Sequence, residues 1–425
     1  MILHIDCNAF FASCEVSLRP DLADKPVVVA NCNEAGGGII LALTKEAKAV
    51  GLKRGDPVFK VTDIINRNNV TVFPANHSKY ADISRRLMQV VRDMELVLNL
   101  KQYSIDEFFG ELPTSDSEEL RDCTGKIKRH IEHCTGIPVS CGISLSYTLA
   151  KVATWYSKHY KGYHGVCVLP EDKIAKALKE LPIEEIWGIG RRTAPKLKAH
   201  GISTALDFHA KAEFEVQRLL GINGVRTWKE LHGVPSVDID NPEQQKSILH
   251  SRTFTYMIQD LETLKSMIAE FTVASSRKLR DQHSVCLAVT TFICTNHHRE
   301  DLEQYDNSAT TRLSVATCDT QTIVKAANEA LNKIYRAGFQ YKRAGVLLSE
   351  ITGDDAIQLD LFSGGEVDIE RSKRLMSAVD NLTAKYGMEK IGLAVQTFGR
   401  KPMNLKNLQP LRNQTTDIAD AIEVK

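Results

Sequence analysis

Residues 101–112 read KQYSIDEFFGEL, and this stretch says most about the fold. Tyr103, Ile105 and Phe109 share one parity, and Ser104, Asp106 and Phe108 share the other, which we interpret as the alternation of a β-strand. We therefore expect a strand that carries two adjacent carboxylates, Asp106 and Glu107.

A second acidic strand end is expected at the N-terminus, where the apolar run Ile2–Ile5 ends at Asp6. Carboxylate oxygens suit Mg²⁺, and two such ions about 4 Å apart can activate an attacking hydroxyl and stabilise a leaving pyrophosphate. Because neighbouring residues on a regular strand point to opposite faces, Asp106 can face Asp6, whereas Glu107 needs a turn or bulge to join them. The spacing alone leaves open that the acidic pair only marks a strand end.

An N-terminal strand that ends in aspartate is also typical of haloacid dehalogenase phosphatases. Their second aspartate would fall at Asn8, which has no carboxylate for general acid catalysis. The sequence therefore disfavours this class of enzyme.

The surrounding sequence predicts an α/β block. Helices are expected over about 78–98, 117–134 and 148–159, and a strand over 137–144. Residues 32–70 change character, with three consecutive glycines followed by a lysine-rich helical stretch, and we interpret them as a small basic insertion.

The second half of the chain has a different order of elements. Polar, proline-containing sequence over about 238–245 predicts a linker. The expected elements beyond it form a βαββαβ unit, which is typical of a ferredoxin-like split domain. They are strand 248–257, helix 260–280, strand 285–295, strand 309–317, helix 320–336 and strand 343–351.

The sequence WGIGRRTAPKLKAHGI, residues 187–202, indicates a helix-hairpin-helix. Glycines allow the tight turn, and backbone amides at the start of the following helix can bind a DNA phosphate. The candidate DNA-binding residues are Gly188, Gly190, Arg191, Arg192 and Lys196. A plain helical hairpin, with glycines for packing, is the alternative.

Two further features are weaker when taken alone. Lys48 and Lys151 lie on expected helices beside small residues and can bind a triphosphate, although such lysines often lie on solvated helix faces. The apolar stretch QLDLF lies between flexible polar residues, which favours a docking peptide over a core strand. Its candidate contact residues are Gln358, Leu359, Leu361 and Phe362.

The composition and net charge limit which classes of protein this chain can belong to. The 425 residues are 43% hydrophobic and 25% charged, a mixture that argues against a disordered, collagen-like or coiled-coil protein. Fifty-four basic against 53 acidic side chains leave a net charge of +1, so any nucleic-acid surface must be local. No membrane span, signal peptide, zinc motif or disulfide framework is evident, and we expect a cytoplasmic protein.

Together these motifs resemble the Y-family translesion DNA polymerases, and most closely the UmuC-type catalytic subunits of bacterial SOS mutagenesis polymerases. The resemblance extends over nearly the whole chain. It rests on six stretches in the family's order: DCNAFFASCE (6–15), NHSKYADISRRL (76–87), YSIDEFF (103–109), SLSYTLAKVA (144–153), WGIGRR (187–192) and QLDLF (358–362).

The resemblance implies an α+β multidomain fold, a right-hand polymerase with a ferredoxin-like palm, small fingers, a helical thumb and a βαββαβ little finger. We expect a palm at 1–31 and 71–167 and fingers at 32–70. A thumb with the helix-hairpin-helix is expected at 168–238, and a little finger at 245–352. Residues 353–425 would form a C-terminal tail that binds the clamp or a partner, and the sequence predicts a helix over about 368–386 within it.

The resemblance also implies roles for single residues. Two Mg²⁺ ions would be held by Asp6, Asp106, Glu107 and the backbone oxygen of Cys7, with Asp106 and Glu107 catalytic. Phe11 matches the steric gate that rejects a ribose 2′-hydroxyl, while Phe10 is expected to pack in the core. Lys48 and Lys151 match triphosphate-binding positions, and QLDLF resembles a clamp-binding motif.

The implied function is error-prone DNA-directed DNA synthesis past lesions, with primer-template DNA and dNTP as substrates. The implied partners are a sliding clamp, a UmuD-like accessory subunit and a recombinase filament, with no membrane. The chain departs from the family's pattern at Leu43, Lys45 and Tyr147. These departures are expected to alter the binding of the base and the triphosphate. The competing interpretations are a non-catalytic subunit that binds DNA and clamp, and a two-metal nuclease.

Overall fold

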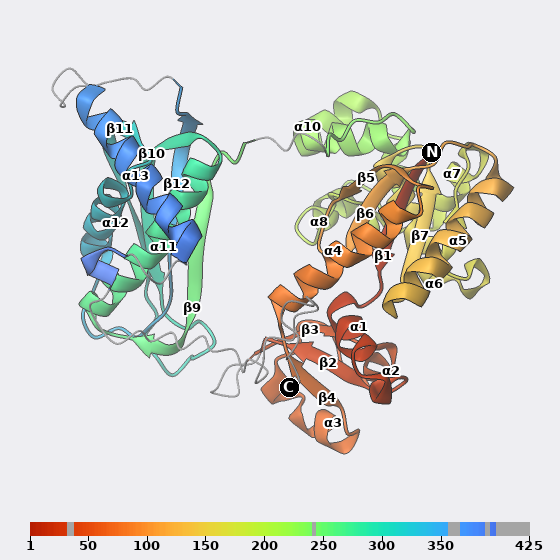
Figure 1. Ribbon diagram of the computed structural model, residues 1–425, viewed down its shortest axis with the longest axis horizontal. Coiled ribbons are helices and arrows are strands. Elements are labelled where there is room, and N and C mark those ends of the chain that lie inside the picture. Colours follow the sequence, from red (N-terminus) through yellow and green to blue (C-terminus); the bar gives the residue numbers. More distant parts are fainter. Residues whose placement is uncertain (32–37, 240–243, 356–365, 387–391, 397–425) are drawn as a thin grey trace, which may run out of the picture. The chain divides into compact units, whose positions relative to one another are not determined.

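The computed structural model describes residues 1–31, 38–239, 244–355, 366–386 and 392–396 (Figure 1). The chain divides near residue 242 into two compact units, which are considered separately below. Within the described residues, no helix has the length and apolarity that crossing a bilayer requires.

A five-stranded sheet forms the centre of the first unit. Its strands lie in the spatial order β5 (Leu98–Gln102), β6 (Glu107–Glu111), β1 (Ile2–Cys7), β7 (Val139–Ser144) and β8 (Val166–Val168). The pair β7–β8 is parallel and the other neighbours are antiparallel. The N-terminal strand β1 thus lies in the middle of the sheet. Its neighbours are β6, which begins at Glu107, and β7, which is followed by helix α6.

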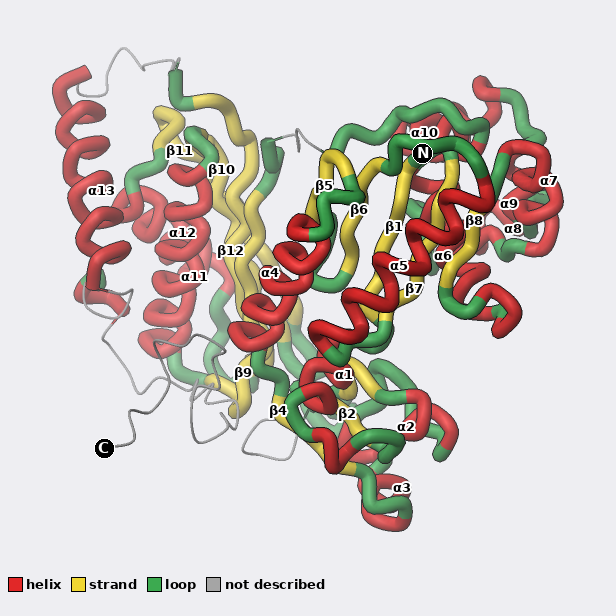
Figure 2. Tube along the Cα trace, turned by 45° about the vertical axis from the view of Figure 1, so that its right-hand side comes forward, coloured by secondary structure: helices red, strands yellow, loops and turns green. Residues whose placement is uncertain are grey.

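The two faces of this sheet differ in chemistry. Helices α4 (His77–Asp93) and α5 (Ser117–Thr135) cover one face (Figure 2). Leu3 and Ile5 of β1 belong to the apolar core on this face. Helix α6 (Tyr147–His159) lies against the other face and buries its own apolar side chains towards a separate core. Because side chains alternate along a strand, the even-numbered residues of β1 point to the α6 face.

Gly142 of β7 allows α6 to approach the sheet closely. It lies opposite His4 of β1, and a Cβ atom added at Gly142 would fall 2.2 Å from the backbone nitrogen of Thr154. A side chain of any size would therefore push the helix away from the strand.

A smaller, three-stranded sheet follows helix α1 (Phe10–Ser17). Its strand β2 (Val27–Ala30) pairs antiparallel with β3 (Ile40–Leu43) and parallel with β4 (Thr71–Pro74). Helices α2 (Lys45–Ala49) and α3 (Thr62–Arg67) complete this subdomain, together with the short 3₁₀ turns η1 (Pro20–Leu22) and η2 (Val58–Lys60). The basic insertion expected at 32–70 is therefore larger in the structure, because β2 and β4, which we had assigned to the main block, belong to this sheet.

The following helical segment packs on α6. It comprises η3 (Lys161–Tyr163), α7 (Glu171–Glu180), η4 (Ile183–Glu185), α8 (Ala194–Ala199), α9 (Ala205–His209) and α10 (Glu213–Leu231), which bends at Gly221. Its apolar side chains, among them Leu178, Leu197 and Phe208, share one core with Leu149 and Val152 of α6.

The second unit contains the predicted βαββαβ order. Its elements are β9 (Ile248–Ile258), α11 (Leu261–Asp281), β10 (Ser284–Cys294), β11 (Asp306–Thr317), α12 (Thr320–Ile334) and β12 (Tyr341–Gly353). The strands form an antiparallel sheet in the order β11-β10-β12-β9, and α11 and α12 bury their apolar faces in its core. This prediction from the sequence is confirmed.

Helix α13 (Glu366–Tyr386) also belongs to this unit. Asp380 accepts two hydrogen bonds from the guanidinium of Arg280 on α11, at 2.6 and 2.8 Å, and Ser372 donates one to Asp319. The short turn η5 (Ala394–Gln396) accepts a hydrogen bond from Ser266 of α11. The helix predicted over about 368–386 is therefore confirmed, and the structure adds that it is attached to the βαββαβ unit.

The prediction of one strand over residues 101–112 was wrong. The chain forms a hairpin, in which β5 ends at Gln102, a tight turn covers residues 103–106, and β6 begins at Glu107. The amides of Tyr103 and Ser104 both donate to the carbonyl of Glu107. This turn contains neither glycine nor proline, which would have indicated a turn in the sequence. The alternation of Tyr103 and Ile105 therefore led to the prediction of a strand.

Candidate active site

Asp6 and Glu107 lie directly opposite each other on β1 and β6. Paired residues of antiparallel neighbours point to the same face, so both carboxylates lie on the α6 face of the main sheet. The sequence predicted that Asp106 faces Asp6 from a regular strand and that Glu107 needs a turn or bulge to join them. The structure contains a turn, at residues 103–106, but Asp106 lies in this turn and Glu107 is the residue that pairs with Asp6.

Asp106 reaches the same edge from the turn instead. Its carbonyl oxygen accepts a hydrogen bond from the amide of Cys7 at 2.9 Å, which ties the turn to the end of β1. Its side chain accepts a hydrogen bond from the hydroxyl of Ser104 at 2.8 Å. The irregular backbone that the acidic motif requires is thus located at Asp106, one residue before the strand.

Helix α6 supplies a lysine to each of the two paired carboxylates. Lys151 Nζ lies 2.6 Å from Glu107 Oε1, and Lys158 Nζ lies 2.6 Å from Asp6 Oδ1. The two lysines are seven residues apart, about two helical turns, so they share one face of the helix. Lys158 was missed by the sequence analysis, and its spacing from Lys151 was the available signal.

Lys151 also contacts an aromatic cluster. Its ammonium lies 4.8 Å from the ring centre of Tyr103 and 5.3 Å from that of Trp187. The indole nitrogen of Trp187 donates a hydrogen bond to the hydroxyl of Tyr103 at 3.1 Å. These contacts join the acidic hairpin, α6 and the glycine-rich turn of the helical segment at one position.

The ionisation of the site follows from this arrangement. Burial acts to raise the pKa of the Glu107 carboxyl, but the proximity of His4 and Lys151 outweighs it and lowers this pKa to about 2. Burial raises the pKa of Asp6, against the effect of Lys158. His4 is buried on the same face, and burial lowers its pKa to about 4, so the imidazole is neutral at pH 7.

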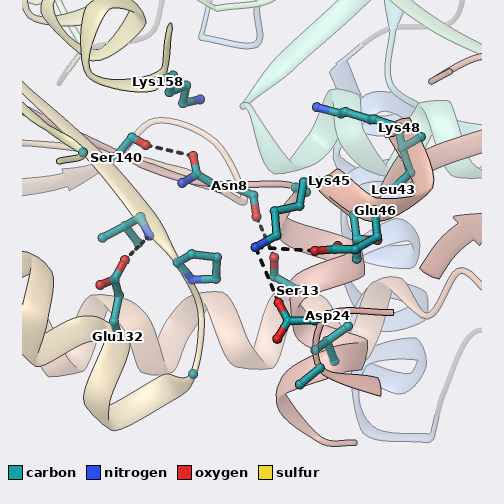
Figure 3. Close-up of a pocket in the computed structure, with 18 of the residues that line it drawn as sticks. Asn8, Ser13, Asp24, Leu43, Lys45, Glu46, Lys48, Glu132, Ser140 and Lys158 are labelled. Carbon is teal, nitrogen blue, oxygen red and sulfur yellow. Dashed lines mark hydrogen bonds and ion pairs between the residues drawn. The ribbon is translucent and has the colours of Figure 1, made fainter. Parts of the chain in front are cut away.

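A pocket of about 840 Å³ is connected to this site through Lys158, which lines the pocket and pairs with Asp6, while Asp6, Asp106 and Glu107 are not among its lining residues (Figure 3). Its lining includes Asn8, Ser13, Thr44 and Ser140, and six lysines against three carboxylates. The lysines are Lys25, Lys45, Lys48, Lys128, Lys158 and Lys161, and the carboxylates are Asp24, Glu46 and Glu132. The excess of positive charge suits a polyanionic ligand.

The predicted triphosphate residues separate in the structure. Lys48 lines the pocket, whereas Lys151 is not among its lining residues and contacts Glu107. Lys45 lies between Asp24, at 3.5 Å, and Glu46, at 3.4 Å (Figure 3). Leu43 is buried in the core of the small sheet, and Tyr147 packs edge-on against Phe109.

Phe11 lies on α1, which contributes Ser13 to the pocket lining, but Phe11 is not itself among the lining residues. Its ring stacks on Tyr80 of α4, with 4.4 Å between ring centres and 19° between the planes. Phe10 is buried in the main core, as expected from the sequence.

The glycine-rich turn precedes α8 and is exposed. Gly188 has a φ of 88°, a conformation that favours glycine. The amide of Ala194, the first residue of α8, donates to the carbonyl of Gly190. Arg191, Arg192 and Lys196 extend into solvent around this turn. The turn and α8 thus have exposed basic side chains at the position where the sequence predicted a helix-hairpin-helix.

Two predicted features are less defined. The candidate clamp peptide lies outside the described residues, with its contact residues Gln358, Leu359, Leu361 and Phe362. Among the residues that are described, no three His, Cys, Asp or Glu side chains converge into a metal-binding group. Asp6 and Glu107 are instead each paired with a lysine, as the distances above show.

Comparison with protein families extends the picture. Residues 5–155 match the impB/mucB/samB family, residues 245–361 match the C-terminal domain of that family, and residues 171–202 match its HHH motif. The three matches lie on the main and small sheets, the βαββαβ unit and the exposed glycine-rich turn.

Individual relatives agree with these matches. The chain is 34% identical to protein UmuC of Salmonella typhimurium over 99% of both chains. It is 34% identical to protein MucB of the same species, over 91% of this chain and 90% of the relative. It is 29% identical to DNA polymerase IV of Bacillus velezensis, over 92% of both.

Solved structures show the same fold. A Y-family DNA polymerase chimera of Dbh and Dpo4 superposes with a TM-score of 0.65 and 23% identity, over 83% of this chain and 99% of that one. A structure described as an insertion ternary complex of Dbh DNA polymerase gives a TM-score of 0.51 over the same shares of the chains.

Proposed function

The chain belongs to the impB/mucB/samB family of UmuC-type, Y-family DNA polymerases, and from this premise we propose how its residues act. It is a DNA-directed DNA polymerase that carries out error-prone translesion synthesis in SOS DNA repair, with primer-template DNA and dNTP as substrates. The observation that supports the assignment to this site is the pairing of Asp6 with Glu107 across β1 and β6, together with Lys158, which contacts Asp6 and lines the lysine-rich pocket.

The acidic edge fits a divalent metal. Asp6, Asp106 and Glu107 provide hard oxygen ligands, and the ammonium groups of Lys151 and Lys158 at 2.6 Å occupy positions where positive charge is favoured. We assign Asp6, Asp106, Glu107 and the backbone oxygen of Cys7 as ligands of two Mg²⁺ ions. When bound, these ions would lower the pKa of the primer 3′-hydroxyl and neutralise the leaving pyrophosphate.

The pocket is the proposed site of the incoming triphosphate. Lys45, Lys48 and Lys158 would neutralise the phosphate oxygens, since all three line the pocket. Lys151 is reassigned from the triphosphate to Glu107, because it contacts this carboxylate and does not line the pocket. Its role is to hold the Glu107 side chain on the α6 face.

Phe11 is proposed as the steric gate. A flat ring beneath the sugar would clash with a 2′-hydroxyl, and such a clash is needed because an apolar pocket alone rejects an added hydroxyl poorly. The stacking of Phe11 on Tyr80 supports this role, since it limits where the ring can lie.

DNA would be held by phosphate contacts from two regions. The turn with Gly188, Gly190, Arg191, Arg192 and Lys196 is one, and the sheet of residues 245–352, as a little finger, is the other. We propose that 168–238 is the thumb and 353–425 a clamp- and partner-binding region. The palm and fingers correspond to the main and small sheets, with the small sheet extended to β2 and β4.

The proposed partners follow from family membership. They are a sliding clamp, bound through Gln358, Leu359, Leu361 and Phe362, a UmuD-like accessory subunit and a recombinase filament. We propose a cytoplasmic location, where these partners and DNA are present.

Primer extension with purified protein tests the function. Wild type is expected to extend a primer with single dNTPs and Mg²⁺, opposite an intact base and an abasic site. Asp106→Ala should lower the rate by about 100-fold or more, because it removes a ligand that acts in the transition state. The matched control Asp122→Ala removes an exposed carboxylate of α5 and should leave extension unchanged.

Two other outcomes would change the assignment. No extension by wild type, alone or with clamp and accessory subunit, would favour the non-catalytic binding subunit. Loss of DNA in the absence of nucleotides would favour the nuclease.

A further inference from the structure

A buried polar cluster lies directly behind Phe11. Glu15 of α1 accepts a hydrogen bond from Lys79 Nζ at 2.6 Å and another from the hydroxyl of Tyr80 at 2.7 Å. The Glu15 and Lys79 side chains are only 4% and 2% exposed, and Tyr80 is fully buried. Both donors come from α4, 64 and 65 residues away along the chain.

The geometry attaches Tyr80 to α1 at two points. Phe11 and Glu15 are four residues apart, so they lie on one face of the helix, one turn from each other. The ring of Tyr80 stacks on Phe11 while its hydroxyl binds Glu15. His77 adds an edge contact to Phe11, with 5.5 Å between ring centres. Tyr80 can therefore neither slide nor tilt without breaking one of these contacts.

A buried ion pair is a costly way to fill this space. Desolvation of the two charges offsets much of their attraction, and apolar residues of similar volume often stabilise a core equally well. What the ion pair provides is orientation, since a charge-assisted hydrogen bond fixes the position of the Tyr80 hydroxyl. Burial and the hydrogen bond to Glu15 both raise the pKa of Tyr80, which keeps this hydroxyl a donor.

We propose that Tyr80, oriented by Glu15 and Lys79, is a positioning residue that supports Phe11 and determines how strongly ribonucleotides are rejected. The proposal rests on the function assigned above, in which Phe11 is the gate. Rejection by a clash works only when the gate cannot retreat, and a shift of about 1 Å is enough to degrade a preorganised site. The support behind the ring is then as important as the ring.

The first test removes the support. Tyr80→Leu leaves space behind Phe11, and we expect the ratio of kcat/KM for dNTP over rNTP to fall about tenfold or more, through a lower KM for rNTP. Insertion of dNTP should change by less than about threefold, because no ligand of the metal or triphosphate is altered. The control is Leu87→Ala, which creates a comparable cavity in the same core. Leu87 lies on α4 about two turns after Tyr80. This control variant should leave the ratio unchanged.

The second test isolates the hydrogen bond. The variants Glu15→Gln/Lys79→Met and Glu15→Leu/Lys79→Met both remove the charges, but only the first keeps an acceptor for the Tyr80 hydroxyl. We expect the Gln variant to keep the dNTP/rNTP ratio within about threefold of wild type, and the Leu variant to lose about fivefold or more, as the loss of one buried hydrogen bond implies. Melting temperatures of the two double variants report any general loss of stability.

The results separate this proposal from the function on which it depends. If wild type extends primers and Phe11→Ala admits rNTP, but Tyr80→Leu and the two double variants leave the ratio unchanged, the positioning role is overturned and the gate stands. If Phe11→Ala does not admit rNTP, the gate assignment itself fails. If wild type does not extend with dNTP, the polymerase function fails first.

Discussion

Lys158 and Asp6 form an ion pair of 2.6 Å between Nζ and Oδ1, on the face where α6 lies against β1. The same ammonium belongs to a side chain that lines the lysine-rich pocket. Lys158 is thus placed between the acidic edge and the proposed triphosphate site. It can neutralise a carboxylate in the free protein and a phosphate when a nucleotide is bound.

Replacement of this lysine tests the pocket. Lys158→Met should raise the KM for dNTP about tenfold with a smaller effect on kcat, because it removes charge that attracts the substrate before the chemical step. Single-nucleotide insertion over a range of dNTP concentrations measures both constants. Lys126→Met, which removes an exposed lysine of α5 paired with Asp122, is the control and should change neither. An unchanged KM in Lys158→Met would place the triphosphate elsewhere.

Lys151 is expected to matter for stability as well as activity. Its side chain and that of Glu107 are 17% and 21% exposed, so the pair is largely shielded from water. Lys151→Met should lower the free energy of unfolding by about 1–3 kcal/mol in the absence of divalent cations, because Glu107 loses a charged hydrogen-bond donor. Urea denaturation in EDTA measures this, and Lys151→Arg should recover most of the loss. Equal stability of Lys151→Met and wild type would contradict the assigned contact.

Gly142 is predicted to control the position of both lysines. A methyl group there would overlap the backbone of α6 at Thr154 and Ala150. Gly142→Ala should therefore cost about 1–3 kcal/mol of stability and reduce primer extension, because α6 carries Lys151 and Lys158 away from the carboxylates. Gly162→Ala is the control, since a Cβ at Gly162 meets no atom within 4 Å. Full activity of Gly142→Ala would show that the site tolerates movement of α6.

The attachment of α13 can be measured separately. Arg280 donates two hydrogen bonds to Asp380 and others to the Cys318 carbonyl and the Thr320 hydroxyl. Arg280→Met should lower the free energy of unfolding of the second unit by about 2 kcal/mol and expose α13 to protease in the folded protein.

The control for this prediction is Arg312→Met. Arg312 also pairs with a carboxylate, Glu350, but the two side chains are 68% and 47% exposed. Exposed pairs contribute about 0–1 kcal/mol, so this variant should be nearly neutral. Equal effects of the two substitutions would mean that α13 is not held by Arg280.

Local patterns were sufficient for much of the second unit and for the long helices. The βαββαβ order was predicted because its elements are long, as in α11 with 21 residues and β10 with 11, and long elements give the clearest local signal. The buried positions of α4 include Ile83, Leu87 and Val91, as the helical spacing predicted. The order of the motifs also indicated the family, which the matches confirmed.

Other features depend on contacts between distant residues. The turn at 103–106 could not be told from a strand, because it contains neither glycine nor proline and its long-range contact is the hydrogen bond from the amide of Cys7 to the carbonyl of Asp106. The short, buried strand β2 carries no signal for which sheet it joins, and only its pairing with β3 and β4 decides this.

The sequence by itself determined the order of the elements in the second unit, the family and the acidic residues proposed for the site. Tertiary structure decided how these residues meet. The register of β1 with β6 aligns Asp6 with Glu107, and the close approach of α6 at Gly142 assigns Lys158 to one carboxylate and Lys151 to the other. The bond between Glu15 and Lys79 likewise exists only because α1 packs on α4. The physical reason is that a local pattern records which side chains are apolar, whereas the partner of a charge depends on elements far away in the chain.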